Sequence, residues 1–198
     1  MSDGTSFVLV GVGGQGTLLA SSILAEVGLA AGFDVKKSEV HGMAQRGGSV
    51  VSHVRWHPEH VCSPLVGTGE ADVLLAFEKM EALRFAEFLK TRGTAVVNDM
   101  AIVPITVSAG SGVYPEDRHL GKVFAGLGAR LIKVPGERLA GEAGNVRAAN
   151  VVLLGAVSRL LPVPEQTWWT CLEQRVPRKF LELNRTAFAA GRQAAAVA

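Results

Sequence analysis

Apolar residues follow two patterns along the chain, short uninterrupted runs and longer stretches with apolar positions at helical spacing. The apolar runs predict strands at 6–12, 73–77 and 94–98. Less regular stretches predict further strands at 33–40, 49–56, 101–107 and 131–134; Ser52, His53 and Arg55 interrupt the run at 49–56, and Pro104 breaks the stretch at 101–107. The spaced stretches predict helices, at 17–31, 79–91, 121–129, 146–161, 165–173 and 178–193. Strands alternate with helices, and most strands are apolar throughout, which is typical of a sheet covered on both sides. We therefore predict an α/β fold: a Rossmann-like, doubly wound, mostly parallel sheet with helices on both faces.

Composition narrows the class of protein. The 198 residues are 48% hydrophobic and 19% charged, and no repeat or long linker divides them, so we expect one domain spanning 1–198. The formal net charge of +2, without a basic run, argues against a nucleic-acid partner. No stretch approaches the roughly 20 apolar residues of a membrane span, and the first residues lack the features of a signal peptide. We expect a cytoplasmic protein that does not bind membranes.

The chain has two cysteines, Cys62 and Cys171, far apart in the sequence and outside any Cys-x-x-Cys motif. Zinc and iron–sulfur sites need about three or four closely placed ligands. We therefore expect no such metal site in this chain alone, and two buried or incidental thiols.

A glycine-rich loop, Gly11-Val-Gly-Gly-Gln-Gly16, follows the first predicted strand and precedes the first predicted helix. This is the form of the dinucleotide-binding fingerprint, in which glycines admit a phosphate and the helix N-terminus attracts it. The alternative is a turn that only packs the helix closely on the sheet. Gln15 could face a ligand or brace a neighbouring loop. Glu39, roughly 20 residues on, could bind a ribose or pair with Arg46, the role that we prefer.

A second loop, at 41–48, concentrates polar side chains around a Gly47-Gly48 bend. His41 could hydrogen-bond a substrate or phosphate, or only the backbone. Arg46 could clamp a carboxylate or phosphate, or hold the loop or a subunit interface. His53 and Arg55, two residues apart on a strand, share one face, which we expect to be an interface or an edge.

Three aromatic residues need separate interpretations. Trp168 and Trp169 are expected to be packing residues, although one of them could anchor a partner. Tyr114, in a loop rich in Ser, Gly and Pro, could line a cleft.

These motifs together resemble a known family, the gamma subunit or gamma domain of 2-oxoacid:ferredoxin oxidoreductases. The resemblance rests on the glycine loop, the 41–48 loop, Ser52-His-Val-Arg55, Asn98 and Asn150-Val-Val-Leu-Leu-Gly155. Within the family the chain is most similar to the stand-alone beta subunit of indolepyruvate ferredoxin oxidoreductase. The whole chain, 1–198, is then one gamma-type catalytic domain of the pyruvate/ketoisovalerate oxidoreductase kind.

The resemblance implies an accessory subunit that completes the active site of a heteromeric enzyme and is inactive alone. A larger partner subunit would carry thiamine diphosphate, Mg and iron–sulfur clusters, ferredoxin would receive the electrons, and coenzyme A would take the acyl group. Candidates for cofactor binding are Gly11, Gly13, Gly14, Gln15, Gly16, Gln45 and Asn98, and candidates for catalysis are His41 and Arg46. A homodimer could form when the partner is missing.

Two alternatives remain open at this point. The glycine fingerprint with Glu39 also fits a stand-alone NAD- or flavin-binding oxidoreductase. A nucleotide-binding regulatory module, which would bind an adenine nucleotide without turnover, fits the same residues.

Overall fold

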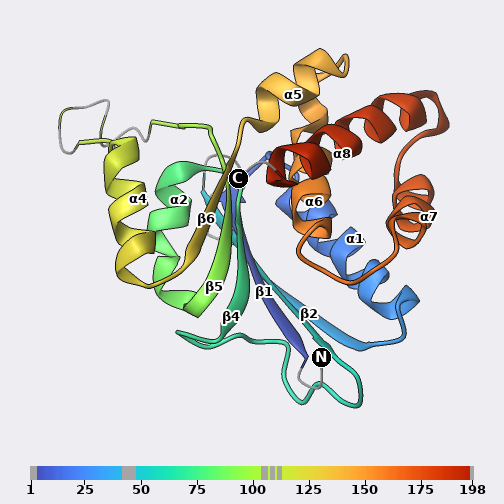
Figure 1. Ribbon diagram of the computed structural model, residues 1–198, viewed down its shortest axis with the longest axis horizontal. Coiled ribbons are helices and arrows are strands. Elements are labelled where there is room, and N and C mark those ends of the chain that lie inside the picture. Colours follow the sequence, from blue (N-terminus) through green and yellow to red (C-terminus); the bar gives the residue numbers. More distant parts are fainter. Residues whose placement is uncertain (1–3, 42–47, 104–106, 108–109, 111–112, 197–198) are drawn as a thin grey trace.

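The computed structural model describes residues 4–41, 48–103, 107, 110 and 113–196 (Figure 1). Six strands form one sheet in the order β2-β3-β1-β4-β5-β6. The strands are β1 (Thr5–Val12), β2 (Asp34–His41), β3 (Ser49–His57), β4 (Ala71–Ala76), β5 (Leu89–Asn98) and β6 (Arg130–Val134).

Helices connect most of the strands. They are α1 (Thr17–Ala30), α2 (Lys79–Arg84), α4 (Asp117–Gly126), α5 (Gly136–Glu142), α6 (Ala149–Ser158), α7 (Glu165–Arg175) and α8 (Leu181–Ala196). Short 3-10 turns are η1 (Ala86–Phe88), η2 (Val146–Ala148) and η3 (Arg178–Phe180). In the described ranges, no helix is both long and apolar enough to span a bilayer.

The sheet is mixed. β1, β4, β5 and β6 pair in parallel, while β3 is antiparallel to both of its neighbours, β1 and β2. Five of the six strands therefore share one direction, so the predicted mostly parallel α/β sheet is confirmed, with one reversed strand. The reversal follows from chain length, because the seven residues between β2 and β3 are too few for the crossover that a parallel pair needs.

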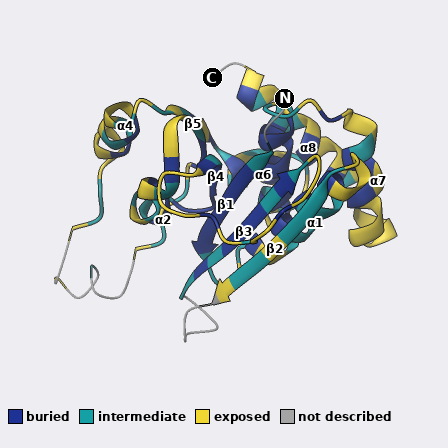
Figure 2. Cartoon of the chain, turned by 90° about the horizontal axis from the view of Figure 1, so that it is seen from below, coloured by how far each residue is buried: buried dark blue, intermediate teal, exposed yellow. Residues whose placement is uncertain are grey.

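Helices cover both faces of the sheet, and each face has its own core (Figure 1). Phe7 and Leu9 of β1 pack toward α1, α6, α7 and α8, whereas Val8 and Val10 pack toward α2 and α4. Because successive strand residues point to opposite faces, strands that feed both cores must be apolar at every position. Figure 2 shows the central strands almost wholly buried and the edge strand β2 more exposed.

Two glycines let α6 and α8 pack with their backbones in contact. A Cβ added at Gly155 would lie 2.1 Å from the Phe188 carbonyl oxygen, and one at Gly191 would lie 1.8 Å from that of Val152. Trp168 and Trp169 are buried against the ring of Phe188, so the expected packing role of the tryptophans is confirmed.

Several predicted boundaries were wrong. The helix predicted at 79–91 ends at Arg84, since Leu89 pairs with Ala71 and begins β5; pairing with a buried neighbour outweighs local helical spacing. Residues 101–103 have no regular structure instead of the predicted strand, and 104–106 lie outside the described residues. The helix predicted at 121–129 is α4, which begins at Asp117. The helix predicted at 146–161 is the 3-10 turn η2 followed by α6. No pattern predicted α5.

Candidate functional site

The glycine loop turns the chain sharply between β1 and α1. Gly14 has φ 104° and Gly16 has φ 82°, a region that side chains other than glycine rarely adopt. Gly16 is also the N-cap of α1, and a Cβ there would lie 2.6 Å from Nδ2 of Asn150. Backbone conformation and close packing therefore both select glycine at position 16.

Gly11 and Gly13 hold the loop against its neighbours. A Cβ on Gly11, within β1, would lie 2.8 Å from Thr17 Oγ1 and 2.9 Å from Phe77 Cβ, so this glycine serves close packing. The Gly13 N–H donates to the Gly48 carbonyl oxygen at 2.9 Å, which ties the glycine loop to the end of the second predicted loop.

The N-terminus of α1 is free of competing groups in the described structure. Gly16 offers no side chain to cap the helix, and the first turn contains no acidic residue. The first N–H groups of such a helix have no partner within the helix and carry a partial positive charge. The loop is therefore suited to an anion, as its sequence predicts.

Gln15 braces the loop. Its Oε1 accepts the Val12 N–H at 2.7 Å, and its Nε2 donates to the Phe77 carbonyl oxygen at 2.9 Å and to Met100 Sδ at 3.4 Å. These contacts join the chain at the ends of β1, β4 and β5. They correspond to the bracing alternative, although Gln15 still lines the cleft described below.

Asn98, at the end of β5, also uses its side-chain amide for hydrogen bonds within the chain. Its Nδ2 donates to the Phe77 carbonyl oxygen at 3.1 Å and to Glu137 Oε1 at 2.9 Å, and its Oδ1 accepts the Gly136 N–H at 3.0 Å. The residue is only 1% exposed. Asn98 therefore positions the start of α5 relative to β4, and its amide has no free donor for a ligand.

A cleft of about 510 Å³ opens beside the glycine loop, at the carboxyl ends of β1, β4 and β5. The connections that follow β1 and β4 leave to opposite faces of the sheet, which makes this a topological switch point, where α/β folds bind ligands. The lining residues are Gly14, Gln15, Gly16, Phe77, Asn98, Met100, Glu137, Val146, Arg147, Ala149 and Asn150.

Two cleft residues retain unused hydrogen-bond donors. Asn150 is 8% exposed, and its Oδ1 accepts the Val151 N–H at 2.9 Å, while its Nδ2 has no partner among the described residues. Arg147 is exposed, and its guanidinium makes no ion pair with the described part of the chain. Glu137, which the cleft also contains, is bonded to Asn98. The free donors favour an anionic ligand.

A smaller, mostly apolar pocket of about 200 Å³ continues from the cleft toward the start of α8. Arg147 and Asn150 line both spaces, while Val176, Phe180 and Leu183 contribute apolar surface. A ligand with an anionic group beside Arg147 could therefore place an apolar part here. No motif in the sequence marks Arg147, and only the fold brings η2 to the glycine loop.

The second predicted loop can be described only at its ends. His41 is the last residue of β2 and pairs with Val50, but its side chain and residues 42–47, which include Gln45 and Arg46, lie outside the described residues. The Ser49 hydroxyl donates to Glu81, a buried carboxylate of α2. The roles of His41, Gln45 and Arg46 therefore stay predictions.

Glu39 lies far from the position of a ribose-binding acid. In a dinucleotide-binding fold the second strand pairs with the first, whereas here β3 lies between β1 and β2. Two strand spacings put Glu39 about 10 Å from β1 across the sheet. Its Oε1 bonds Lys37 Nζ at 2.7 Å and the Ser21 hydroxyl at 3.3 Å. The expected partner, Arg46, is not described, and the acid has a structural role between β2 and α1.

His53 and Arg55 hold the 58–70 loop on the sheet. His53 is buried, its Nδ1 accepts the Val66 N–H at 3.3 Å, and burial lowers its pKa, so the ring is neutral near pH 7. Arg55 Nη1 donates to the Leu65 carbonyl oxygen at 3.1 Å. Since β2 and β6 are the edge strands, the edge alternative for His53 and Arg55 was wrong, and the interface alternative stays a prediction.

Tyr114 is not among the residues that line this cleft; its hydroxyl donates to Glu78, a buried acid that also caps α2. Burial, together with this hydrogen bond, raises the pKa of Tyr114 well above its ordinary value. Nearby, hydrogen bonds from Lys133 and Lys79 lower the pKa of Asp117, at the start of α4, to about 2. These contacts fasten the connection between β5 and α4.

The chain resembles several known proteins over its full length. Residues 6–194 match the family described as pyruvate ferredoxin/flavodoxin oxidoreductase. Subunit IorB of indolepyruvate oxidoreductase from Thermococcus kodakarensis is 40% identical over 193 residues, which is 96% of this chain and 95% of that one.

Two solved structures share the fold. The gamma subunit of a keto/oxoacid ferredoxin oxidoreductase from Geobacter sulfurreducens PCA superposes with a TM-score of 0.73 at 26% identity, covering 98% of this chain and 99% of that one. A 2-oxoglutarate:ferredoxin oxidoreductase from Magnetococcus marinus, with 2-oxoglutarate, coenzyme A and succinyl-CoA bound, gives a TM-score of 0.79 at 21% identity. It matches 100% of this chain and 32% of that one.

Proposed function

Because the chain belongs to the pyruvate ferredoxin/flavodoxin oxidoreductase family, we propose that it is an accessory subunit of a heteromeric 2-oxoacid:ferredoxin oxidoreductase. The complete enzyme oxidatively decarboxylates an arylpyruvate, with indolepyruvate as the first candidate, and passes electrons to ferredoxin in the cytoplasm. The observation that carries this proposal is the 40% identity to an indolepyruvate oxidoreductase subunit over 96% of the chain.

The thiamine diphosphate, magnesium and iron–sulfur clusters of this chemistry belong, in the proposal, to a larger partner subunit. The described ranges contain no group of three or more His, Cys, Asp or Glu placed to hold a metal ion. The role of this chain is to complete the active site from outside.

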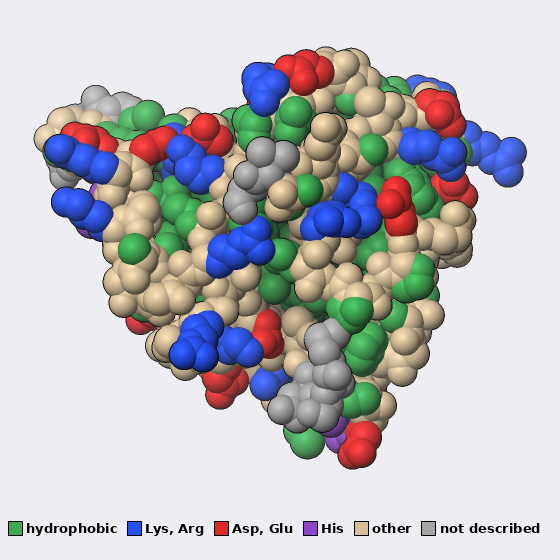
Figure 3. All heavy atoms as spheres, viewed as in Figure 1, with side chains coloured by type: hydrophobic (Ala, Val, Ile, Leu, Met, Phe, Trp, Pro, Cys, Tyr) green, Lys and Arg blue, Asp and Glu red, His purple; other side chains and the backbone are tan. Residues whose placement is uncertain are grey.

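The carboxyl edge of the sheet is the surface that we propose for the partner. Of eight large hydrophobic side chains exposed in the described structure, five lie at this edge: Leu18, Val40, Val103, Val113 and Val146. Exposed apolar side chains along one edge, of which Val146 also lines the cleft, favour a protein partner. On the face that Figure 3 shows, Lys and Arg side chains form several separate groups, most of them with acidic side chains nearby.

Coenzyme A is the ligand that we propose for the cleft. Its phosphates would meet the free donors of Arg147, Asn150 and the N-terminus of α1, and an apolar part would fit the adjoining pocket. The cleft volume, about 510 Å³, lies within the range of ligand sites. The structure with coenzyme A bound that shares the fold supports the choice.

Co-expression with the larger subunit tests the assembly. Val40→Lys introduces a charge at the carboxyl edge, and Leu65→Lys does the same on the 58–70 loop with nearly equal exposure, 53% against 54%. We expect Val40→Lys to reduce co-purification and arylpyruvate-dependent ferredoxin reduction, and Leu65→Lys to preserve both. A stable, active chain without any partner would overturn the proposal.

Calorimetry with coenzyme A tests the ligand, first on the chain and then on the assembled enzyme. Arg147→Gln should weaken binding at least tenfold, since it removes a charged donor. Arg138→Gln is the matched control, because Arg138 is exposed but pairs with Glu142 on the far side of α5. Equal affinity in both variants, with coenzyme A still bound, would exclude the cleft as the phosphate site.

A further inference from the structure

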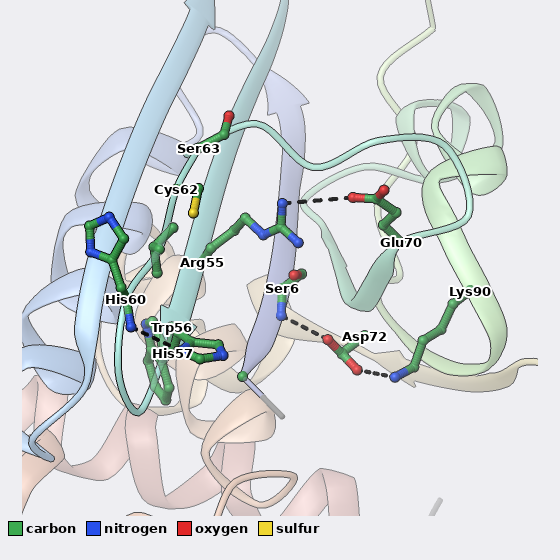
Figure 4. A pocket seen from close by; sticks show the side chains of 12 residues that line it. Ser6, Arg55, Trp56, His57, His60, Cys62, Ser63, Glu70, Asp72 and Lys90 are labelled. Atoms are coloured by element: carbon green, nitrogen blue, oxygen red, sulfur yellow. Dashed lines mark hydrogen bonds and ion pairs between the residues drawn. The ribbon is translucent and has the colours of Figure 1, made fainter. Parts of the chain in front are cut away.

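A second cavity, of about 480 Å³, lies at the opposite edge of the sheet from the glycine loop (Figure 4). Its floor is formed by the amino ends of β1 and β4 and by the carboxyl end of the antiparallel strand β3, and the loop that joins β3 to β4 forms one wall. Neither the family resemblance nor the proposed function assigns it a role.

Polar side chains from three adjacent strands form the floor. Ser6 of β1 lies directly opposite Arg55 of β3, and the Ser6 N–H donates to Asp72 Oδ2 of β4 at 2.7 Å. Lys90 of β5 closes an ion pair with the other oxygen of Asp72. The carboxylate of Asp72 is therefore satisfied, while Ser6 and Arg55 turn their side chains toward the cavity (Figure 4).

Three groups in the cavity have unused hydrogen-bonding capacity. Ser6 is 8% exposed, yet its hydroxyl has no partner in the described part of the chain. Arg55 bonds only through Nη1, leaving Nε and Nη2 free among the described residues. Glu70 accepts the Gly67 N–H with Oε2, and that oxygen lies 3.7 Å from Arg55, so its Oε1 is free. The Ser6 hydroxyl is therefore free to bond a ligand that enters the cavity.

The charges that line the cavity balance, since Arg55 and Lys90 oppose Glu70 and Asp72. A ligand with one net charge would leave that charge uncompensated in a partly enclosed space. A ligand that carries both signs avoids this cost. We propose that the cavity binds the zwitterion of an α-amino acid, with its carboxylate on Arg55 and the Ser6 hydroxyl and its ammonium on Glu70.

Protection of Cys62 measures occupancy, because this exposed thiol lines the cavity and the other cysteine, Cys171, is buried. The full chain is treated with iodoacetamide, and modification is located by mass spectrometry. Glycine and L-phenylalanine are each compared with the acid that lacks the amino group and the amine that lacks the carboxylate. We expect saturable protection by the amino acids and little by acetate, 3-phenylpropanoate, methylamine or phenethylamine.

Two variants test the contacts. Ser6→Ala, which breaks no hydrogen bond within the described chain, should raise the half-protecting concentration about tenfold. Ser22→Ala, the same change at a half-buried position of α1 outside the cavity, should leave it unchanged. Glu70→Gln should abolish the preference for amino acids and let acetate protect as well as glycine. No protection by either amino acid, equal protection by acetate in the unmodified chain, or an unchanged preference in Glu70→Gln would overturn the inference. The assay needs neither partner nor coenzyme A, so its failure and that of the proposed function are separate results.

Discussion

Replacing Asn98 with aspartate tests whether this residue builds the cleft or binds its ligand. The substitution keeps the size of the side chain and the oxygen that accepts the Gly136 N–H. It removes both donors, one to the Phe77 carbonyl oxygen and one to Glu137. It also places a second carboxylate against the first, in a position that is only 1% exposed.

The cost can be estimated term by term. The lost bond to Phe77 is worth about 1 kcal/mol, because that carbonyl keeps its bond from Gln15. The lost bond to the carboxylate of Glu137 is worth about 2 kcal/mol. Repulsion at this separation has an upper bound of about 5 kcal/mol at an effective dielectric constant near 20, and about 1 kcal/mol survives once Glu137 turns toward water. The free energy of unfolding should fall by about 4 kcal/mol near neutral pH.

The deficit should depend on pH with a fixed sign. The neighbouring carboxylate raises the pKa of the introduced carboxyl above its unfolded value of about 4. The folded state then binds a proton more tightly than the unfolded state, so stability falls as pH rises through the raised pKa. Urea unfolding at pH 7.5 and pH 5 should show the larger deficit at pH 7.5.

Asn145→Asp is the matched control. Only Oδ1 of Asn145 is used, as an acceptor from the Arg147 N–H at 3.0 Å, and aspartate caps equally well. We expect a change within about 0.5 kcal/mol. If Asn98→Asp were equally harmless, or lost ligand affinity without losing stability, the bracing role would be refuted and direct ligand binding restored.

Two further predictions follow from other parts of the fold. Gly191→Ala should lower the free energy of unfolding, measured in urea, by roughly 3 kcal/mol, because its Cβ would lie 1.8 Å from the Val152 carbonyl oxygen. Gly121→Ala, in open space within α4, should raise it by about 0.5–1 kcal/mol. Equal effects of the two substitutions would contradict this packing. Tyr114 is the sole tyrosine, and its pKa is raised by burial and by Glu78, so phenolate absorbance should appear well above pH ~10 in the folded protein and near it in urea. The stability from this contact is present below pH ~10 and is lost as pH rises through the folded pKa; a folded midpoint near 10 would contradict it.

The sequence predicted those features that depend on residues close together along the chain. Apolar runs marked β1, β4 and the second half of β5, because a strand buried on both faces needs apolar side chains at every position. The glycine loop was predicted at its observed place between β1 and α1, since positive φ at Gly14 and Gly16 and the crowding around Gly11 leave few other residues possible.

Roles that depend on neighbours distant in sequence could not be predicted in this way. Asn98 looked like a ligand residue, but α5, which no pattern predicted, supplies two of its three partners. For Glu39, ribose binding was the alternative to the preferred ion pair with Arg46, and only the sheet order, which places β3 between its strand and β1, argues against that alternative. Arg147 carries no motif, and it lines the cleft only because η2 packs beside the glycine loop.

The sequence by itself determined the α/β class, the glycine turn and the family, since these follow from periodicity, backbone conformation and residues that lie close together along the chain. The tertiary structure alone decided which donors are free. The side-chain amides of Gln15 and Asn98 donate hydrogen bonds that brace the strand ends. Asn150 and Arg147, in contrast, have donors in the cleft without a partner among the described residues. A hydrogen-bonding group is available to a ligand only when no neighbouring group already bonds it, and the fold determines which groups are neighbours.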